Sequence, residues 1–211
     1  MSLIGQSWEL MCELAKRTPW GRIQIQPLIN DIANVAPEFV RFLENGGRVI
    51  VQQRTFPLWR TVMLGRHQTP ETYLASIEAR GRKPNKWARD IAAKTTCSQE
   101  VIDLPLVDVS GADLLGFTQV YTYAQFLERA ATFGLYRCPA ETGLVLADQF
   151  DGQPYGDYRR IAMEAIADFD GGLSVFCVYH DGGGLRLGTD SGRPGSQSVP
   201  ESRWVLTTRK P

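Results

Sequence analysis

The sequence has no excess charge of either sign and no long apolar run. Lysine and arginine total 23, as do aspartate and glutamate, so whole-molecule electrostatics favours neither nucleic acid nor an anionic membrane. No apolar stretch approaches the ~20 residues that a membrane-spanning helix needs. The first residues also lack the basic and apolar regions of a signal peptide. We therefore expect a protein without a membrane partner.

Cysteine and histidine are also scarce. The four cysteines, Cys12, Cys97, Cys138 and Cys177, are widely scattered, which is neither a disulfide framework nor a zinc-binding pattern. Such spacing is typical of a reducing compartment, so we expect a cytoplasmic protein. With two histidines, no Ser/His/Asp set and no recognised cofactor motif can be assembled. We expect no metal or other cofactor, and we find no motif that identifies an enzyme.

What remains is the composition of an ordinary globular protein, with 43% hydrophobic and 22% charged residues. In the first half, the pattern predicts helices that begin at Ser7 and near Pro37. The segments 48–54 and 58–64 are predicted to pair as a β-hairpin. Residues 100–109 contain a proline, which cannot donate to a ladder, so we expect an edge strand at best.

Two further helices are predicted between residues 70 and 94. Thr69 followed by Pro70 is typical of a helix start, because threonine caps the helix and proline fits its first turn. Asn85 can cap the second helix, which we expect to extend to Lys94. The intervening glycine and proline separate the two helices.

The second half carries a clear amphipathic helix followed by strands. Thr122 and Gln125 have the spacing of a capping box, and Gly134 ends the helix. A short helix is expected after Pro139. Four alternating segments then predict an antiparallel β-meander: 159–166, 173–179, 184–188 and 203–208. The predicted fold class is α+β, with a mostly helical first half and, in the second half, helices packed on the meander.

Glycines at 111 and 116 are typical of a hinge. We place a domain boundary there, between a helical region with a hairpin at 1–115 and a helix plus antiparallel sheet at 116–211. A single domain is the alternative.

The favoured functional hypothesis is a binding or interaction module for a protein or a small ligand. Polar residues gather where the short helix meets the first strand of the meander. We expect Glu141, Gln153, Arg159 and Glu164 to bind a polar ligand in a cleft there. The ordinary alternative for Glu164 is a solvent-facing carboxylate.

A second hypothesis is a nucleic-acid-binding accessory protein that uses the basic helix pair 70–94. Residues 80–94 contain six cations and one acid, and Arg82, Lys86 and Arg89 would contact phosphates. Four acids between residues 100 and 113 offer another explanation, because they would neutralise the basic residues within the same chain.

Two further possibilities rest on single residue types. Glu141 and Glu164 would be the acid/base residues of a small hydrolase or transferase. Arg60 lies in the predicted strand 58–64 with apolar neighbours on its face, where a guanidinium can hold a carboxylate or phosphate. An exposed strand arginine is the simpler explanation for Arg60.

Several motifs between residues 56 and 209 carry a resemblance: WRTVxLGxHxTP at 59–70, CPAExG at 138–143, QP at 153–154 and AME at 162–164. Together they resemble a bacterial protein family for which no activity is established. The resemblance implies a soluble bacterial protein and transfers no catalytic residue.

Overall fold

The computed structural model describes residues 55–116 and 119–210. The chain divides into two compact units, Met1–Gln52 and Gln53–Pro211, and all described residues belong to the second. The predicted helices at Ser7 and Pro37, and the predicted strand 48–54, lie outside the described residues.

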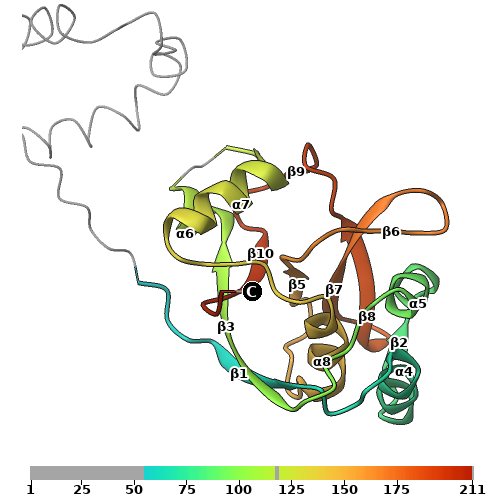
Figure 1. Ribbon diagram of the computed structural model, residues 1–211. Helices are drawn as coiled ribbons and strands as arrows, with labels where there is room; N and C mark the ends of the chain where they lie inside the picture. Colours follow the sequence, from blue (N-terminus) through green and yellow to red (C-terminus); the bar gives the residue numbers. More distant parts are fainter. Residues whose placement is uncertain (1–54, 117–118, 211) are drawn as a thin grey trace, which may run out of the picture. The chain divides into compact units, whose positions relative to one another are not determined.

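A curled mixed sheet of eight strands is the framework of this unit (Figure 1). Its order is β1 (Arg60–Leu64), β3 (Ile102–Ser110), β10 (Arg203–Thr207), β5 (Tyr158–Ile161), β7 (Leu173–Asp181), β8 (Gly184–Ser191) and β2 (Lys83–Pro84), with β6 (Ile166–Ala167) paired to β7. A separate two-stranded sheet joins β4 (Tyr121–Thr122) to β9 (Gln197–Ser198). The long sheet therefore combines strands from both halves of the chain.

Within the described residues, five helices pack on this sheet: α4 (Pro70–Ala79), α5 (Lys86–Ala93), α6 (Gly111–Leu115), α7 (Tyr123–Thr132) and α8 (Glu141–Gln149). Side-chain caps explain the starts of α4 to α7, whereas α8 begins without one. Thr69 accepts a hydrogen bond from the Thr72 amide, and Asn85 accepts one from the Ala88 amide. Thr122 and Gln125 form the predicted capping box of α7. These three predicted helix starts are confirmed.

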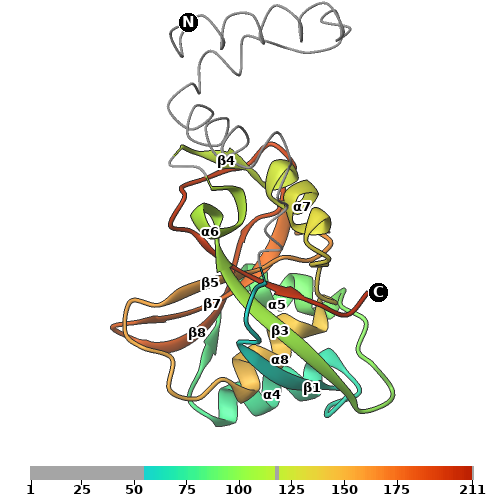
Figure 2. The same cartoon turned by 90° about the vertical axis from the view of Figure 1, so that its left-hand side faces the viewer.

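Helix α8 lies within the curl of the sheet, behind β1 and β3 in Figure 2. Every residue from Glu141 to Asp148 is buried. A Cβ atom added at Gly143 would lie only 2.5 Å from the Cβ of Phe176 on β7, so the absence of a side chain permits this close contact. α4 packs on α8 from outside, and α5 packs next to α4. α8 is consequently the centre of the hydrophobic core.

Helices α6 and α7 pack against β3 and β10. Trp204 on β10 is 1% exposed and its ring lies 4.8 Å from that of Tyr123 and 5.3 Å from that of Phe126. The Trp204 indole N–H donates to the Tyr121 hydroxyl at 2.9 Å. Aromatic packing of this kind, with the polar atoms hydrogen-bonded, fixes α7 on the sheet.

The α+β class is borne out, but two details of the predicted layout are wrong. The strands do not form a purely antiparallel meander, because β10 runs parallel to β5 and β2 runs parallel to β8. β3 is not an edge strand, because it lies between β1 and β10. Pro105 is tolerated there since it lies one residue beyond the last β3–β10 pair, Leu106 with Thr207, where the ladder ends.

The glycine-flanked segment predicted as a hinge is helical. Ser110 and Asp113 form a capping box for α6, and Gly116 ends the helix with a φ of 71°, a conformation that favours glycine. Residues before and after this segment belong to the same compact unit.

Candidate functional site

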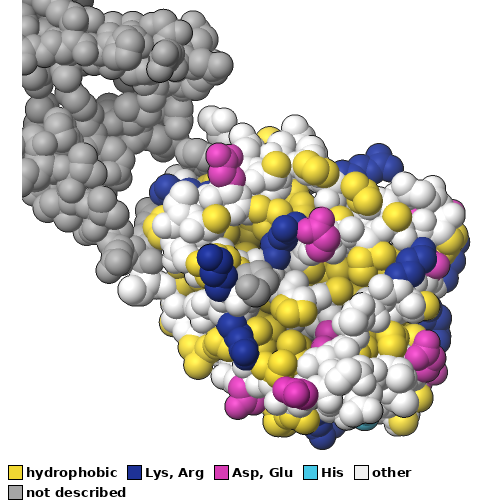
Figure 3. Space-filling view, in the orientation of Figure 1, with side chains coloured by type: hydrophobic (Ala, Val, Ile, Leu, Met, Phe, Trp, Pro, Cys, Tyr) yellow, Lys and Arg dark blue, Asp and Glu magenta, His cyan; other side chains and the backbone are white. Residues whose placement is uncertain are grey.

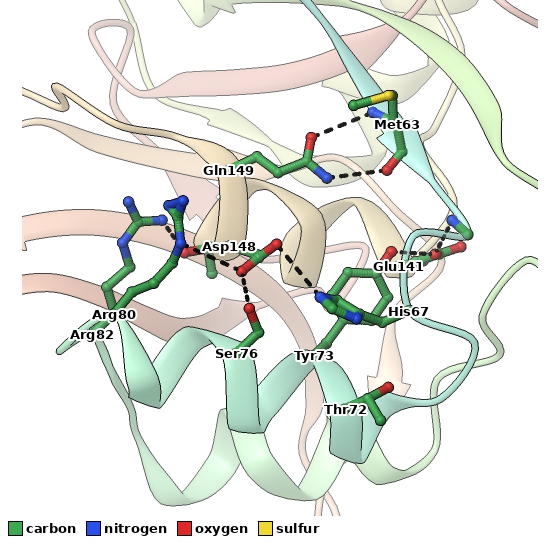
Figure 4. Close-up of polar contacts among 12 residues, drawn as sticks. Met63, His67, Thr72, Tyr73, Ser76, Arg80, Arg82, Glu141, Asp148 and Gln149 are labelled. Atoms are coloured by element: carbon green, nitrogen blue, oxygen red, sulfur yellow. Dashed lines mark hydrogen bonds and ion pairs between the residues drawn. The ribbon is translucent and has the colours of Figure 1, made fainter.

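The predicted ligand-binding residue Glu141 lies at the start of α8 and is 1% exposed. Its carboxylate accepts three hydrogen bonds: from the Gly65 amide at 2.7 Å, the Tyr73 hydroxyl at 2.8 Å and the Ser98 amide at 2.8 Å. Burial and this carboxylate raise the pKa of Tyr73 well above its usual value. Glu141 thus joins three separate segments to α8, and its oxygens point into the protein (Figure 4).

A second polar group lies further along the α4–α8 contact. Asp148 of α8 accepts a hydrogen bond from the Ser76 hydroxyl at 2.6 Å, and its other oxygen lies 3.8 Å from Nε2 of His67. Figure 4 shows the carboxylate between these two side chains. In a serine hydrolase the imidazole lies between the hydroxyl and the carboxylate. The order here is different, so these residues do not form a catalytic triad.

Gln153 and Arg159 both contact Asp157, which connects them. Gln153 is buried, and its amide donates to the carbonyls of Val178 at 3.1 Å and Asp157 at 3.3 Å. Arg159 pairs with the Asp157 carboxylate and, through Nε at 2.7 Å, with Asp108. Gln153 therefore fixes the loop that carries Asp157, and Asp157 fixes Arg159.

Arg159 belongs to what we call the arginine cluster: Arg60, Arg159, Arg203, Asp108 and Asp157. The Asp108 side chain is 3% exposed and pairs with both Arg159 and Arg203, whose distances to it are 2.7 and 3.0 Å. Arg60 has no such partner among the described residues, and its Nε is buried without a hydrogen bond. Burial and the neighbouring Arg159 lower the pKa of Arg60.

Glu164 lies elsewhere, at the edge of a pocket beside α7. Its side chain is 79% exposed and pairs with Arg137. Glu141 and Glu164 thus occupy different environments, one buried and one exposed. The carboxylate pair that a two-acid hydrolase requires is not formed by these two residues in this arrangement.

We call this concavity the α7 pocket. It has a volume of about 560 Å³, within the range typical of small-molecule sites. One wall is α7 and the opposite wall comprises the segment between β5 and β6, the start of β7 and the turn after β8 (Figure 1). Its apolar lining residues are Tyr123, Ala124, Leu127, Ala130, Ala131, Leu135, Met163, Ala165, Leu173, Pro194 and Leu206. The face of the molecule seen in Figure 3 exposes many hydrophobic side chains.

Two hydrogen bonds between Tyr123 and Met163 hold the floor of the α7 pocket together. The Tyr123 hydroxyl donates to the Met163 carbonyl at 2.8 Å and accepts from the Met163 amide at 3.0 Å. Burial raises the pKa of Tyr123 far above its usual value, so the hydroxyl stays neutral. These bonds connect α7 to the opposite wall, and the Arg137–Glu164 pair provides charge at the rim.

The α7 pocket was not predicted from the sequence, although Glu164 was named. A signal is visible in α7, where Ala124, Leu127 and Ala131 recur at helical spacing beside the core-facing Tyr123, Phe126 and Ala130. The apolar face of α7 is consequently wider than its core contact requires.

The predicted nucleic-acid residues are mostly engaged within the protein. Arg82 is 6% exposed and binds the Ala147 carbonyl and Asp151. Arg89 pairs with Glu78. Lys86 lies over the Trp87 ring, with Nζ 4.3 Å from its centroid. The basic helix pair is therefore largely neutralised by neighbouring acids.

Two other features are absent from the part of the chain that the structure describes. Within residues 55–116 and 119–210, no three histidine, cysteine or acidic side chains are grouped so that they could hold a metal ion. None of the described helices is both long and apolar enough to span a membrane. The chain matches no protein-family model, no curated protein and no solved structure.

Proposed function

We propose that this protein is a binding module whose α7 pocket holds a small, largely apolar ligand. The observation that carries the proposal is the pocket itself: about 560 Å³, lined mainly by apolar side chains, with the Arg137–Glu164 pair and Glu128 as its charged residues. Ligand sites commonly combine an apolar interior with a few polar groups that orient the ligand. Arg137 and Glu164 supply such groups here.

The charged pair also suggests the chemistry of the ligand. Arg137 and Glu164 are 48% and 79% exposed, so their ion pair contributes little to stability and is easily exchanged for a ligand contact. A ligand with an apolar body and one terminal carboxylate or amine would place its body between α7 and Leu173 and its charged group at this rim. Leu173, 38% exposed at the opposite wall, would gain burial in the complex.

Ligand binding is favoured over nucleic-acid binding because the relevant side chains differ in availability. The pocket has a solvent-accessible apolar lining with no occupant from the described chain. Arg82 and Arg89, by contrast, already have acidic partners, which phosphates would have to displace. Releasing Arg82 would also leave the Ala147 carbonyl without the hydrogen bond that Arg82 donates, which adds a further cost.

Thermal unfolding against a panel of small aromatic and aliphatic carboxylates and amines tests the proposal. A ligand that binds only the folded state at a hundredfold excess over its Kd stabilises by about 2.7 kcal/mol. We expect one chemical class to raise the unfolding midpoint of the wild-type protein. Ala131→Trp should remove this shift, because Ala131 is exposed on α7 and a large ring there fills the pocket.

The matched control is Ala75→Trp, an equivalent substitution at an exposed position of α4, away from the pocket. This variant should keep the ligand-induced shift. A panel without any shift, or a shift that survives Ala131→Trp, would contradict the proposal.

A further inference from the structure

Within the described part of the chain, the Arg60 guanidinium packs on two aromatic rings and has no ion-pair partner. Its guanidinium carbon lies 3.7 Å from the ring centroid of Phe150 and 4.2 Å from that of Trp59. The two rings meet edge to face at 5.1 Å, so they form an aromatic corner around the cation. Aromatic faces attract a guanidinium, but they carry no net negative charge.

The charges around this corner do not balance. The arginine cluster contains three arginines and two aspartates. Asp108 forms ion pairs with Arg159 and Arg203, and Asp157 forms one with Arg159. Within the described residues, no acid pairs with Arg60. The C-terminal end of α8, which Phe150 caps, contributes partial negative charge but no full charge. One positive charge is therefore left over at a half-buried position.

A second guanidinium reinforces this excess. The guanidinium carbon of Arg159 lies 4.9 Å from the same Trp59 ring and 5.5 Å from the same Phe150 ring. Both cations thus share one aromatic corner, although like charges repel. Arg159 is held there by Asp108 and Asp157, so its position does not depend on Arg60. A half-buried cation without a partner, beside a fixed cation, is an arrangement that an incoming anion would stabilise.

We propose that Arg60 and the adjacent Arg159 form a binding site for a small oxyanion, the carboxylate or phosphate group of a ligand. The guanidinium fork of Arg60 would bind two oxygens of the anion, and Arg159 would add its charge from the side. The site is separate from the α7 pocket, whose lining includes neither arginine nor the aromatic corner. It does not depend on the proposed function of that pocket.

The test is an NMR titration of the full-length protein that follows the side-chain Nε–Hε signals of arginine. Inorganic phosphate and acetate are added separately at constant ionic strength, so that the two sources of an oxyanion are compared. We expect the Arg60 signal to shift and saturate with at least one of them. The internal control is Arg66, an exposed arginine two residues beyond β1 that has no ion pair among the described residues.

Two variants make the result decisive. Phosphate or acetate should also raise the unfolding midpoint of the wild-type protein. Arg60→Met keeps a long apolar side chain against Phe150 and removes the charge, so this rise should be lost in the variant. Arg60→Lys keeps the charge but loses the fork, so binding should weaken by at least about tenfold. Arg66→Met should behave like wild type.

An Arg60 signal that moves only in proportion to that of Arg66, without saturation, would overturn the proposal. So would an anion-induced stabilisation that persists unchanged in Arg60→Met. Saturation with phosphate alone would define the site as one for phosphate groups, and saturation with acetate alone would define it as one for carboxylates.

Discussion

Replacing Glu141 with glutamine should destabilise the fold without changing its shape. One carboxylate oxygen accepts from Gly65 and Tyr73, and the other accepts from Ser98. In the glutamine variant, the carbonyl oxygen can keep the first two bonds, but the amide group then faces the Ser98 N–H. Two donors would meet in a buried site, which leaves both unsatisfied.

The magnitude follows from these three hydrogen bonds. An unsatisfied buried donor costs about 1–3 kcal/mol, and a bond to a charged acceptor is worth roughly 1 kcal/mol more than a bond to a neutral one. Together these effects predict that Glu141→Gln lowers the free energy of unfolding by about 3 kcal/mol. For a domain of this size, that corresponds to a midpoint about 6–12 °C lower.

The assay is urea unfolding of four proteins: wild type, Glu141→Gln, Tyr73→Phe and the double variant. Tyr73→Phe alone should cost about 2 kcal/mol, because it removes one charge-assisted hydrogen bond. In the Glu141→Gln background it should cost about 1 kcal/mol less, which measures the coupling between the two side chains. Glu100→Gln, at an exposed site, should change stability by no more than about 0.5 kcal/mol. The reasoning is refuted if Glu141→Gln unfolds within about 1 kcal/mol of wild type.

Three further predictions concern packing, charge and pH. Gly143→Ala should cost about 1–3 kcal/mol, because its methyl group would overlap Phe176, and urea unfolding measures the loss. Asp108→Ala should cost about 3 kcal/mol in the same assay, since its buried carboxylate joins two arginines. Stability should fall above about pH 9, because burial raises the pKa of Cys97 to about 11 and that of Cys177 to about 12. Unfolded thiols release their protons first, so alkali favours the unfolded chain, and unfolding curves at several pH values will show it.

The two substitutions have matched controls. Gly182→Ala places a methyl group in open space and should be nearly neutral. Asp103→Ala removes an exposed carboxylate from the same strand as Asp108 and should cost far less. If Gly143→Ala and Gly182→Ala lose equal stability, the packing argument is wrong. If Asp108→Ala and Asp103→Ala lose equal stability, the charge argument is wrong. A stability that stays level or rises between about pH 8 and pH 10 would contradict the pH argument.

Helix starts could be predicted because their causes are local. Thr69, Asn85 and Thr122 each accept a hydrogen bond from the backbone amide three residues away, so the necessary information lies within one turn of sequence. The approximate positions of β7, β8 and β10 were also predictable, because alternation of apolar residues is a short-range pattern.

Strand order could not be predicted, since it depends on contacts between distant segments. β10, at the end of the chain, inserts between β3 and β5 and runs parallel to β5. Local alternation carries no information on which strand is a neighbour or in which direction it runs. The expected edge position of β3 was wrong for this reason.

The same limit applies to the site residues. Sequence proximity placed Glu141, Gln153, Arg159 and Glu164 together, but Glu141 binds inward to Gly65, Tyr73 and Ser98, while Glu164 lies at the rim of the α7 pocket. Arg159 instead pairs with Asp108, a residue 51 positions away in the sequence that was not among the predicted site residues. Which polar residues meet is decided by the tertiary fold.

Methyl NMR of leucine tests the central claim about the α7 pocket most directly. Leu173 lines the pocket and is 38% exposed, whereas Leu58 is 61% exposed and does not line it, so the two side chains serve as reporter and control in one spectrum. Titration with the compound that gives the largest rise in unfolding midpoint should shift the Leu173 methyl signals to saturation and leave the Leu58 signals in place. Leu173 signals that do not move while the compound still stabilises the protein would show that the ligand binds elsewhere, and the claim would be wrong.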